Sequence, residues 1–92
     1  MRDFILLDLT DNVATALKDL PAGYRLKADN GLSVVADVAI PSGHKIALCD
    51  IALAGVVIKY GKVIGKTTTS IKAGELVHVH NVTSLRGKSR HE

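Results

Sequence analysis

The sequence predicts a mostly-β domain of short strands, with one short helix near residues 12–19. Short aliphatic segments alternate with glycines along most of the 92 residues, and 47% of the residues are hydrophobic. An Asn-Gly pair at 30–31 separates two alternating segments, which is the pattern of a tight β-hairpin whose two turn residues both have positive φ. Only the stretch 12–20 has its apolar residues at helical spacing.

The N-terminal part is expected to form a strand followed by the helix. Phe4 to Leu9 is almost entirely apolar, which predicts a strand covered on both faces. Thr10 or Asp11 would cap the helix. Pro21 would end it, because proline lacks an amide hydrogen and restricts the residue before it.

The rest of the chain is expected to be short β segments. Strands are predicted at residues 24–28 and 32–36, and a strand–turn–strand unit at 59–65. The pattern apolar-x-x-Gly-x-x-apolar recurs at 20–26, 40–46, 71–77 and, with one extra residue, 51–58. The copies are too short and unevenly spaced for a solenoid, so they predict recurring corners in one compact, bent structure.

The charge distribution argues against several classes of partner. Residues 1–85 hold 9 Lys or Arg against 8 Asp or Glu, so most of the net charge of +3 lies in residues 86–92. Only three residues are aromatic, which disfavours a stacking platform for nucleic acid. No signal peptide or membrane-spanning segment is recognisable. We therefore expect a cytoplasmic domain over residues 1–83, with a basic tail or linker start at 84–92, that binds neither nucleic acid nor membrane.

Three histidines are the first candidates for a functional site. In a strand, His78 and His80 would stand on the same face. His44 directly follows the corner Gly43, in a context similar to the one that precedes the His78 strand. Neutral imidazoles suit metal binding and acid–base work. Half-exposed strand and turn histidines without a function remain the alternative.

Four sequence blocks resemble the altronate and galactarate dehydratase family, specifically its N-terminal or small-subunit module, a SAF domain. The same module forms the small subunit of the related sulfolactate sulfo-lyase. The blocks are DNVA at 11–14, IPSGHKIALCDI at 40–51, VIKYGKVIG at 57–65 and IKAGELVHVHN at 71–81. The resemblance covers about residues 3–82 and implies a β-clip fold of short strands with a small helix.

The implied reaction is β-elimination on a sugar acid. A base removes the proton α to the carboxylate, an enolate forms and the β-hydroxyl leaves, which yields a 2-keto-3-deoxy acid. Such enzymes are typically metal-dependent, with Fe²⁺ or Mn²⁺ as the usual ions. The family's larger catalytic domain is not found in this sequence. We therefore expect a non-autonomous subunit or module of a carbon–oxygen lyase, with no metal of its own and no activity alone.

The resemblance and the residue types together suggest roles. The catalytic candidates are His44, Lys45, His78 and His80, and the metal ligands would be His78 and His80. The substrate-binding candidates are Asp11, Asn12, Lys59, Tyr60 and Asn81, of which Asp11 and Asn12 could instead be helix caps. The expected partners are a large catalytic subunit and a small hydroxy acid, and a homo-oligomer stays open. The alternatives are a non-catalytic SAF module that binds a sugar acid or a partner protein, and the small subunit of a sulfolactate sulfo-lyase.

Overall fold

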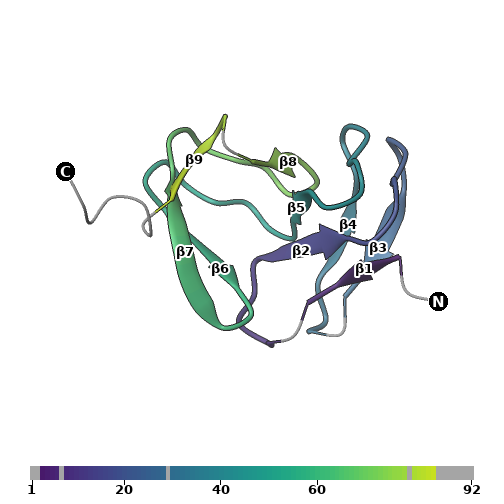
Figure 1. Ribbon diagram of the computed structural model, residues 1–92, viewed down its shortest axis with the longest axis horizontal. Helices are drawn as coiled ribbons and strands as arrows, with labels where there is room; N and C mark the ends of the chain where they lie inside the picture. Colours follow the sequence, from purple (N-terminus) through teal and green to yellow (C-terminus); the bar gives the residue numbers. More distant parts are fainter. Residues whose placement is uncertain (1–2, 7, 29, 79, 85–92) are drawn as a thin grey trace.

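Nine short strands form three small antiparallel sheets in the computed structural model, which describes residues 3–6, 8–28, 30–78 and 80–84 (Figure 1). The strands are β1 (Phe4–Ile5), β2 (Val13–Ala16), β3 (Arg25–Lys27), β4 (Ser33–Val35), β5 (Lys45–Ala47), β6 (Val56–Lys59), β7 (Lys62–Thr67), β8 (Leu76–Val77) and β9 (Val82–Ser84). The described residues include no helix. The predicted mostly-β class is confirmed, and the predicted helix is wrong.

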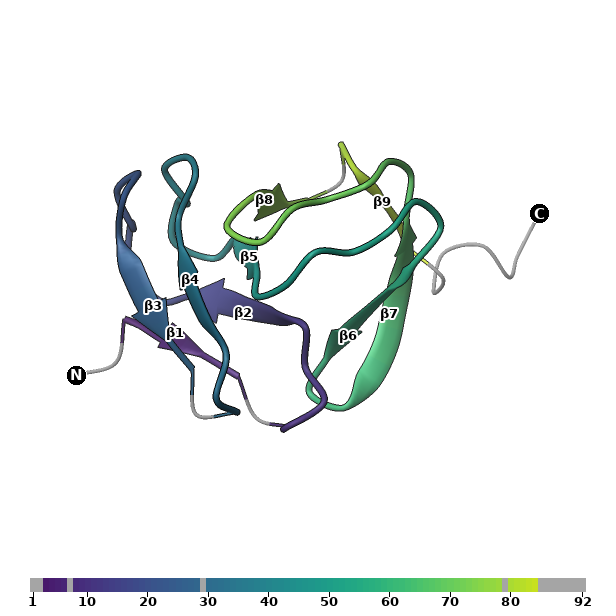
Figure 2. The same cartoon turned by 180° about the vertical axis from the view of Figure 1, so that it is seen from behind.

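A central sheet with the order β1-β2-β5-β8 lies between the other two sheets. The β3–β4 hairpin stands on one side and the β6-β7-β9 sheet on the other, as both views show (Figures 1 and 2). Each side has its own aliphatic core. Ala14 and Ile46 of the central sheet belong to the core with the β3–β4 hairpin, whereas Val13 and Ala47 belong to the core with Val57 of β6.

This position explains why residues 13–16 form a strand and not a helix. Val13, Ala14 and Ala16 are all buried, so both faces of β2 are covered by core. A strand covered on both faces is apolar without strict alternation and can mimic a short helical pattern. A two-turn helix is marginal alone, whereas β2 pairs with both β1 and β5.

The residues expected to cap the helix have other partners. Asp8 accepts hydrogen bonds from the backbone and hydroxyl of Thr10, at 2.9 and 2.6 Å, in a turn that follows β1. One carboxylate oxygen of Asp11 accepts a 2.8 Å bond from the amide of Gly61. The first strand is also shorter than expected, since β1 ends at Ile5.

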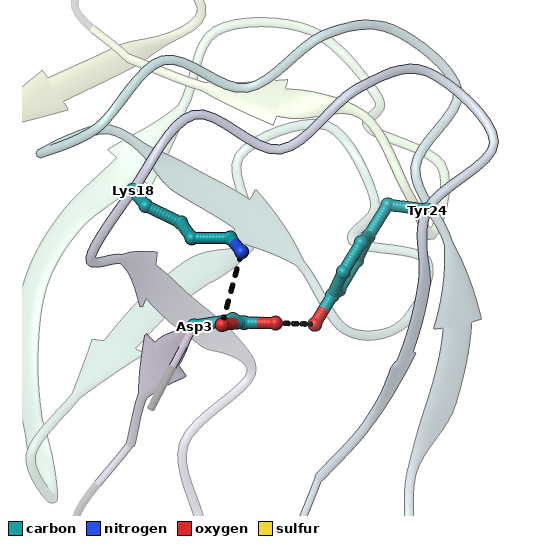
Figure 3. A network of polar contacts seen from close by, with 3 residues as sticks. All are labelled: Asp3, Lys18 and Tyr24. Atoms are coloured by element: carbon teal, nitrogen blue, oxygen red, sulfur yellow. Dashed lines mark hydrogen bonds and ion pairs between the residues drawn. The ribbon is translucent and has the colours of Figure 1, made fainter. Parts of the chain in front are cut away.

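A polar network joins the N-terminal strand to the β3–β4 hairpin (Figure 3). The hydroxyl of Tyr24 donates a 2.6 Å hydrogen bond to Asp3, and the ammonium of Lys18 lies 3.4 Å from the other oxygen of that carboxylate. The bond from Tyr24 lowers the pKa of Asp3 more than any other cause, and the same bond raises the pKa of Tyr24. The network therefore holds β1 against the segment that leads into β3.

Both predicted hairpins are present, with a difference in their turns. β3 pairs with β4 around residues 30–31, but only Gly31 of this pair has a positive φ. The side chain of Asn30 donates to the carbonyl of Asp11 and accepts from the amide of Leu32. The two-residue turn with both residues left-handed lies instead between β6 and β7, at Tyr60 and Gly61.

The recurring corners belong to a repeat of 31 residues. Isolated bridges join Leu20 to Ile40 and, 31 positions later, Ile51 to Ile71. The strand pairs β2–β5 and β3–β4 are matched at the same offset by β5–β8 and β6–β7. The backbone hydrogen bonds of the corners also repeat after 31 residues: the amide of Gly43 donates to Ala16, and that of Gly74 donates to Ala47. The chain therefore contains two copies of one β unit that share β5, a regularity that the sequence analysis missed.

The corner at residues 51–57 has the same length as the others, which corrects the expected extra residue. Ala54, and not Gly55, occupies the place of Gly23, Gly43 and Gly74, and it is left-handed with a φ of 62°. Its amide donates to Thr67, as the amide of Gly23 donates to Ala36, 31 residues earlier.

The last described strand reaches residue 84, and the expected division into a domain over 1–83 and a tail over 84–92 stays a prediction. β9 pairs with β7 and ends at Ser84. Residues 85–92, which make up most of the expected tail, lie outside the described residues. No helix in the described part of the chain has the length and apolar character needed to cross a membrane.

Candidate functional site

The structure brings His44 and His78 into contact at the end of the β5–β8 ladder. Lys45 pairs with Val77 in this ladder, so the residues just beyond the pair face each other. The two imidazole rings lie 4.3 Å apart between centroids, at an interplanar angle of 45°. Two histidines far apart in the sequence therefore form one side-chain pair.

Backbone hydrogen bonds hold His44 in place. Its amide donates to the carbonyl of Pro41 at 3.0 Å, and its carbonyl accepts from the amide of Ala16 in β2 at 2.8 Å. Its Nδ1 lies 3.4 Å from the carbonyl of Ser42, which it can contact as a donor in one tautomer. The ring is thus presented from a corner whose backbone is fixed on two sides.

His78 and His80 do not lie on one strand face, which corrects the prediction. β8 ends at Val77, and the chain turns after His78, where the amide of Asn81 donates to the carbonyl of His78 at 3.0 Å. The side-chain oxygen of Asn81 accepts from the amide of His78 at 2.9 Å and closes this turn. His78 is half-buried, and His80 is exposed.

The pKa of His78 lies below its usual value. Burial is the largest cause, because it disfavours the charged imidazolium. The positive charges of His44, Lys45 and His80 lower this pKa further, in that order. His78 is therefore a neutral imidazole at neutral pH and can accept a proton.

Lys45 stands beside this pair at the start of β5, where it faces Thr15 of β2 and Val77 of β8. Its side chain is half-buried, and burial lowers its pKa. The positive charge of Lys59 lowers the pKa of Lys45 further. Two lysines from different sheets are thus close enough to repel each other.

Lys59 and Tyr60 lie at the end of β6 and in the turn that follows. The ammonium of Lys59 is 4.9 Å from the centroid of the Tyr60 ring, within the range of a cation–π contact. Tyr60 is 40% exposed. Its ring therefore covers one side of Lys59 at the surface.

The amide side chains of Asn12 and Asn81 are used to connect backbone segments. Asn12 donates to the carbonyl of Val56 at 2.9 Å and accepts from the amide of Ile58 at 2.8 Å, which ties β6 to the start of β2. Asn81 also donates to the carbonyl of Leu76 at 2.8 Å. Their arrangement is that of structural bridges, and substrate binding by these residues stays a prediction.

The described residues do not make a complete metal site. No group of three or more His, Cys, Asp or Glu side chains among them is arranged to hold a metal ion. His44 and His78 would supply two ligands at most, whereas Fe²⁺ and Mn²⁺ sites use more. We therefore derive no chemical step through a metal on this chain.

Thr15 is a polar residue of this region that sequence reasoning missed. Its hydroxyl oxygen is buried and has no hydrogen-bond partner in the described structure. It lies opposite Lys45 in the β2–β5 ladder, so both side chains are on the same face of the sheet. The sequence carries no signal for it, because the apolar residues of the stretch 12–19 have helical spacing.

Comparison with known proteins identifies the family. Residues 2–85 match the family model described as the altronate/galactarate dehydratase SAF domain. The chain is 47% identical over 79 residues to an altronate dehydratase of Escherichia coli and 43% identical over 81 residues to that of Bacillus subtilis. These matches cover 85% and 88% of the chain but only 16% of each relative, so the chain spans about one sixth of their length.

A further relative has a length close to that of the chain. The (2R)-sulfolactate sulfo-lyase subunit alpha of Chromohalobacter salexigens is 38% identical over 90 residues, which cover 91% of the chain and 96% of the relative. Together with the match to the family model over residues 2–85, these similarities show that the chain belongs to the SAF domain family of altronate and galactarate dehydratases.

Proposed function

We propose that this chain is the SAF component of a hydro-lyase that converts a sugar acid of the altronate or galactarate type to a 2-keto-3-deoxy acid. A separate large catalytic subunit completes the active site. The family membership supports the reaction class. The single observation that supports a role for this chain is the contact between His44 and His78 at the open end of the central sheet.

The histidine pair is suited to the proton transfers of β-elimination. His78 is neutral at neutral pH because of its lowered pKa, and it takes up the proton α to the carboxylate. The electron pair left on the α carbon forms the enolate, and the β-hydroxyl leaves as water with a proton donated by His44. The enol that results tautomerises to the 2-keto-3-deoxy acid. His44, in ring contact with His78, is placed to exchange a proton with the reacting groups. Lys45 and Lys59 supply positive charge for the carboxylate.

A large subunit would supply what the chain lacks. It would cover the histidine pair and exclude water, which strengthens electrostatic interactions during the reaction. Fe²⁺ or Mn²⁺, if the assembled enzyme uses one, would take most of its ligands from that subunit, because the described residues of this chain offer no group of three.

Reconstitution with the large dehydratase subunit of the same genome tests this function. The expected result is a 2-keto-3-deoxy acid from altronate or galactarate with the complex, and none with either subunit alone. His78→Gln should lower kcat by about 10²–10⁴-fold, the usual contribution of a general base. Lys66→Gln, at an exposed site on β7, is the control. A complex that forms but gives no product, or an unchanged kcat in His78→Gln, would contradict the proposal.

A second candidate is the small subunit of a sulfolactate sulfo-lyase. It is favoured by the match over 96% of a relative named as such a subunit. The same reconstitution distinguishes the two functions, because a sulfo-lyase releases sulfite from (2R)-sulfolactate and forms no 2-keto-3-deoxy sugar acid. Binding of a sugar acid without either product would identify a non-catalytic module.

A further inference from the structure

Four basic side chains, Lys45, Lys59, His44 and His78, gather at one end of the central sheet, and we call them the basic cluster. The two histidines are in ring contact, Lys45 follows His44 in the chain, and the charge of Lys59 acts on Lys45. Lys62 lies opposite Lys59 in the β6–β7 ladder and adds a further positive charge. The cluster therefore joins residues from β5, β6 and the end of β8.

No carboxylate among the described residues pairs with the basic cluster. The carboxylates of the adjoining segments accept hydrogen bonds from backbone amides instead. Asp11 accepts from Gly61 at 2.8 Å and from Asp8 at 3.3 Å, and Glu75 accepts from Lys72 at 3.1 Å. The ion pair of the described residues joins Lys18 to Asp3, outside the basic cluster.

The internal repeat shows that the fold does not need these charges. Thirty-one residues before Lys45, Lys59 and His78, the equivalent positions of the first copy hold Ala14, Ala28 and Ala47. All three alanines are buried and belong to the cores. At these three positions the second copy carries a basic side chain where the first carries a core alanine, so the repeated fold does not depend on the basic side chains.

The hydroxyl of Thr15 points to a ligand at the same place. It is a buried polar atom without a partner, on the sheet face that it shares with Lys45. Buried hydroxyls in folded proteins normally have a partner, and one that lacks it calls for an explanation. The oxygen is covered as the side chain stands, so Thr15 would have to rotate toward Lys45 to donate to a bound oxygen acceptor there. An anion at this place would also reduce the repulsion between Lys45 and Lys59.

We propose that Lys45, Lys59 and Thr15 form an anion-binding site that holds the acid group of a small hydroxy acid on this chain itself, before any large subunit is present. The chemistry is that of a carboxylate or sulfonate oxygen facing two ammonium groups and a hydroxyl donor. The inference rests on the proposed function in one respect: that function identifies the molecule that carries the acid group as a small hydroxy acid. It adds Thr15 to the two lysines that face the acid group, and it expects binding by this chain alone.

Calorimetric titration of the purified full chain tests this site. Galactarate and (2R)-sulfolactate are the two anionic ligands, and galactitol is the uncharged polyol control. We expect at least one acid to bind, galactitol not to bind, and the affinity to fall as ionic strength rises. Comparison of the two acids shows whether the site prefers a carboxylate or a sulfonate.

Substitutions locate the site. Lys45→Gln and Lys59→Gln should each weaken binding at least about tenfold, as expected for loss of a charge-assisted hydrogen bond, and Thr15→Val should weaken it less. Lys66→Gln, which removes an exposed lysine of β7, should leave affinity unchanged. Thermal melts verify that each variant is folded. If Thr15→Val fails to fold, Lys59→Gln at the end of β6 still tests the site.

Several results would overturn the anion site. They are no binding of either acid to the isolated chain, equal binding of galactitol, or an equal loss in Lys66→Gln and Lys45→Gln. The proposed function can fail separately: a chain that binds the acid but gives no product in the reconstituted complex keeps the site and loses the reaction. An active complex whose small chain binds no acid keeps the reaction and loses the site.

Discussion

The imidazole rings of His44 and His78 lie 4.3 Å apart because Lys45 and Val77 are paired in the β5–β8 ladder. His44 enters this contact from a corner and His78 from the end of the last strand of the central sheet. Their relative position is therefore determined by strand pairing and not by their distance in the sequence.

We predict that the pKa of His78 depends on His44. The pKa should lie below its usual value of 6.5, and His44→Gln should raise it only partly, because burial is the larger cause. Titration of the His78 ring signals by NMR, in the chain and in His44→Gln, measures both values. An unchanged pKa in the variant would contradict the electrostatic coupling.

The same shift predicts how stability depends on pH. As the pH falls below 6.5, the unfolded chain binds a proton at His78 before the folded domain does, so acidification through this range lowers the free energy of unfolding. His78→Gln should flatten the profile between 6.5 and the folded pKa. Urea unfolding at several pH values measures the slope. The change should be smaller in His80→Gln, because the charge of His80 is the smallest of the causes that lower the pKa of His78.

Gly74 should be the least replaceable of the corner glycines. It has a φ of +93°, and an added Cβ would overlap the carbonyl oxygen of Val35. We expect Gly74→Ala to destabilise the domain by more than about 3 kcal/mol or to prevent folding, since steric overlap adds to the cost of a left-handed residue.

Gly43→Ala is the matched control for this substitution. Gly43 has a φ of +88°, but no atom lies within 4 Å of its added Cβ. Its cost should be limited to about 1–2 kcal/mol of backbone strain. Chemical denaturation of both variants measures the difference, and equal losses would refute the close approach of Gly74 and Val35.

Ala54→Gly should leave stability unchanged or raise it by up to about 1 kcal/mol. Ala54 occupies the corner position at which the other copies have glycine, with a φ of 62°. Glycine relieves the strain and costs some conformational entropy in the unfolded chain. Ala22→Gly, at a turn position of another corner without a positive φ, should cost about 0.5–1 kcal/mol. A loss at Ala54 as large as at Ala22 would contradict the equivalence of the corners.

Asn12→Ala should lower stability more than it changes substrate affinity. The side chain makes two hydrogen bonds to the backbone of β6, and the change leaves Val56 and Ile58 without these partners. The expected cost is about 2 kcal/mol. Thr83→Ala, at an exposed strand position, is the control. An increase of KM in the assembled enzyme without a loss of stability would instead identify Asn12 as a substrate ligand.

Lys45→Met should stabilise the isolated domain by up to about 1 kcal/mol while it weakens anion binding. Burial and the charge of Lys59 both disfavour the ammonium of Lys45. Without a bound anion to offset this, the ammonium destabilises the folded domain, so replacing Lys45 by methionine should stabilise it. Lys27→Met, at an exposed position on β3, should have little effect. A lower melting temperature for Lys45→Met than for the unchanged chain would show that the lysine stabilises the fold.

The errors of sequence interpretation have identifiable causes. The helix expected near residues 12–19 is β2, because buried Val13, Ala14 and Ala16 fit a helical period and a strand covered on both faces equally well. The shared face of His78 and His80 requires a strand through residue 80, but the side chain of Asn81 closes a turn directly after Val77. The first error arose because the strands that pair with β2 are distant in the sequence. The second arose because the side chain of Asn81 binds the backbone of His78 in place of a strand partner.

The sequence by itself determined the features that depend on neighbouring residues: the mostly-β class, the two hairpins, the glycine corners and the family to which the chain belongs. Backbone conformations such as a left-handed turn are local, so residue types indicate them directly. Only the tertiary structure decided that His44 meets His78 and that Lys45 lies near Lys59 and Thr15. These contacts depend on which strands pair and in which register. Burial of the two cores selects that pairing, and it involves residues too far apart in the sequence for a local pattern to indicate.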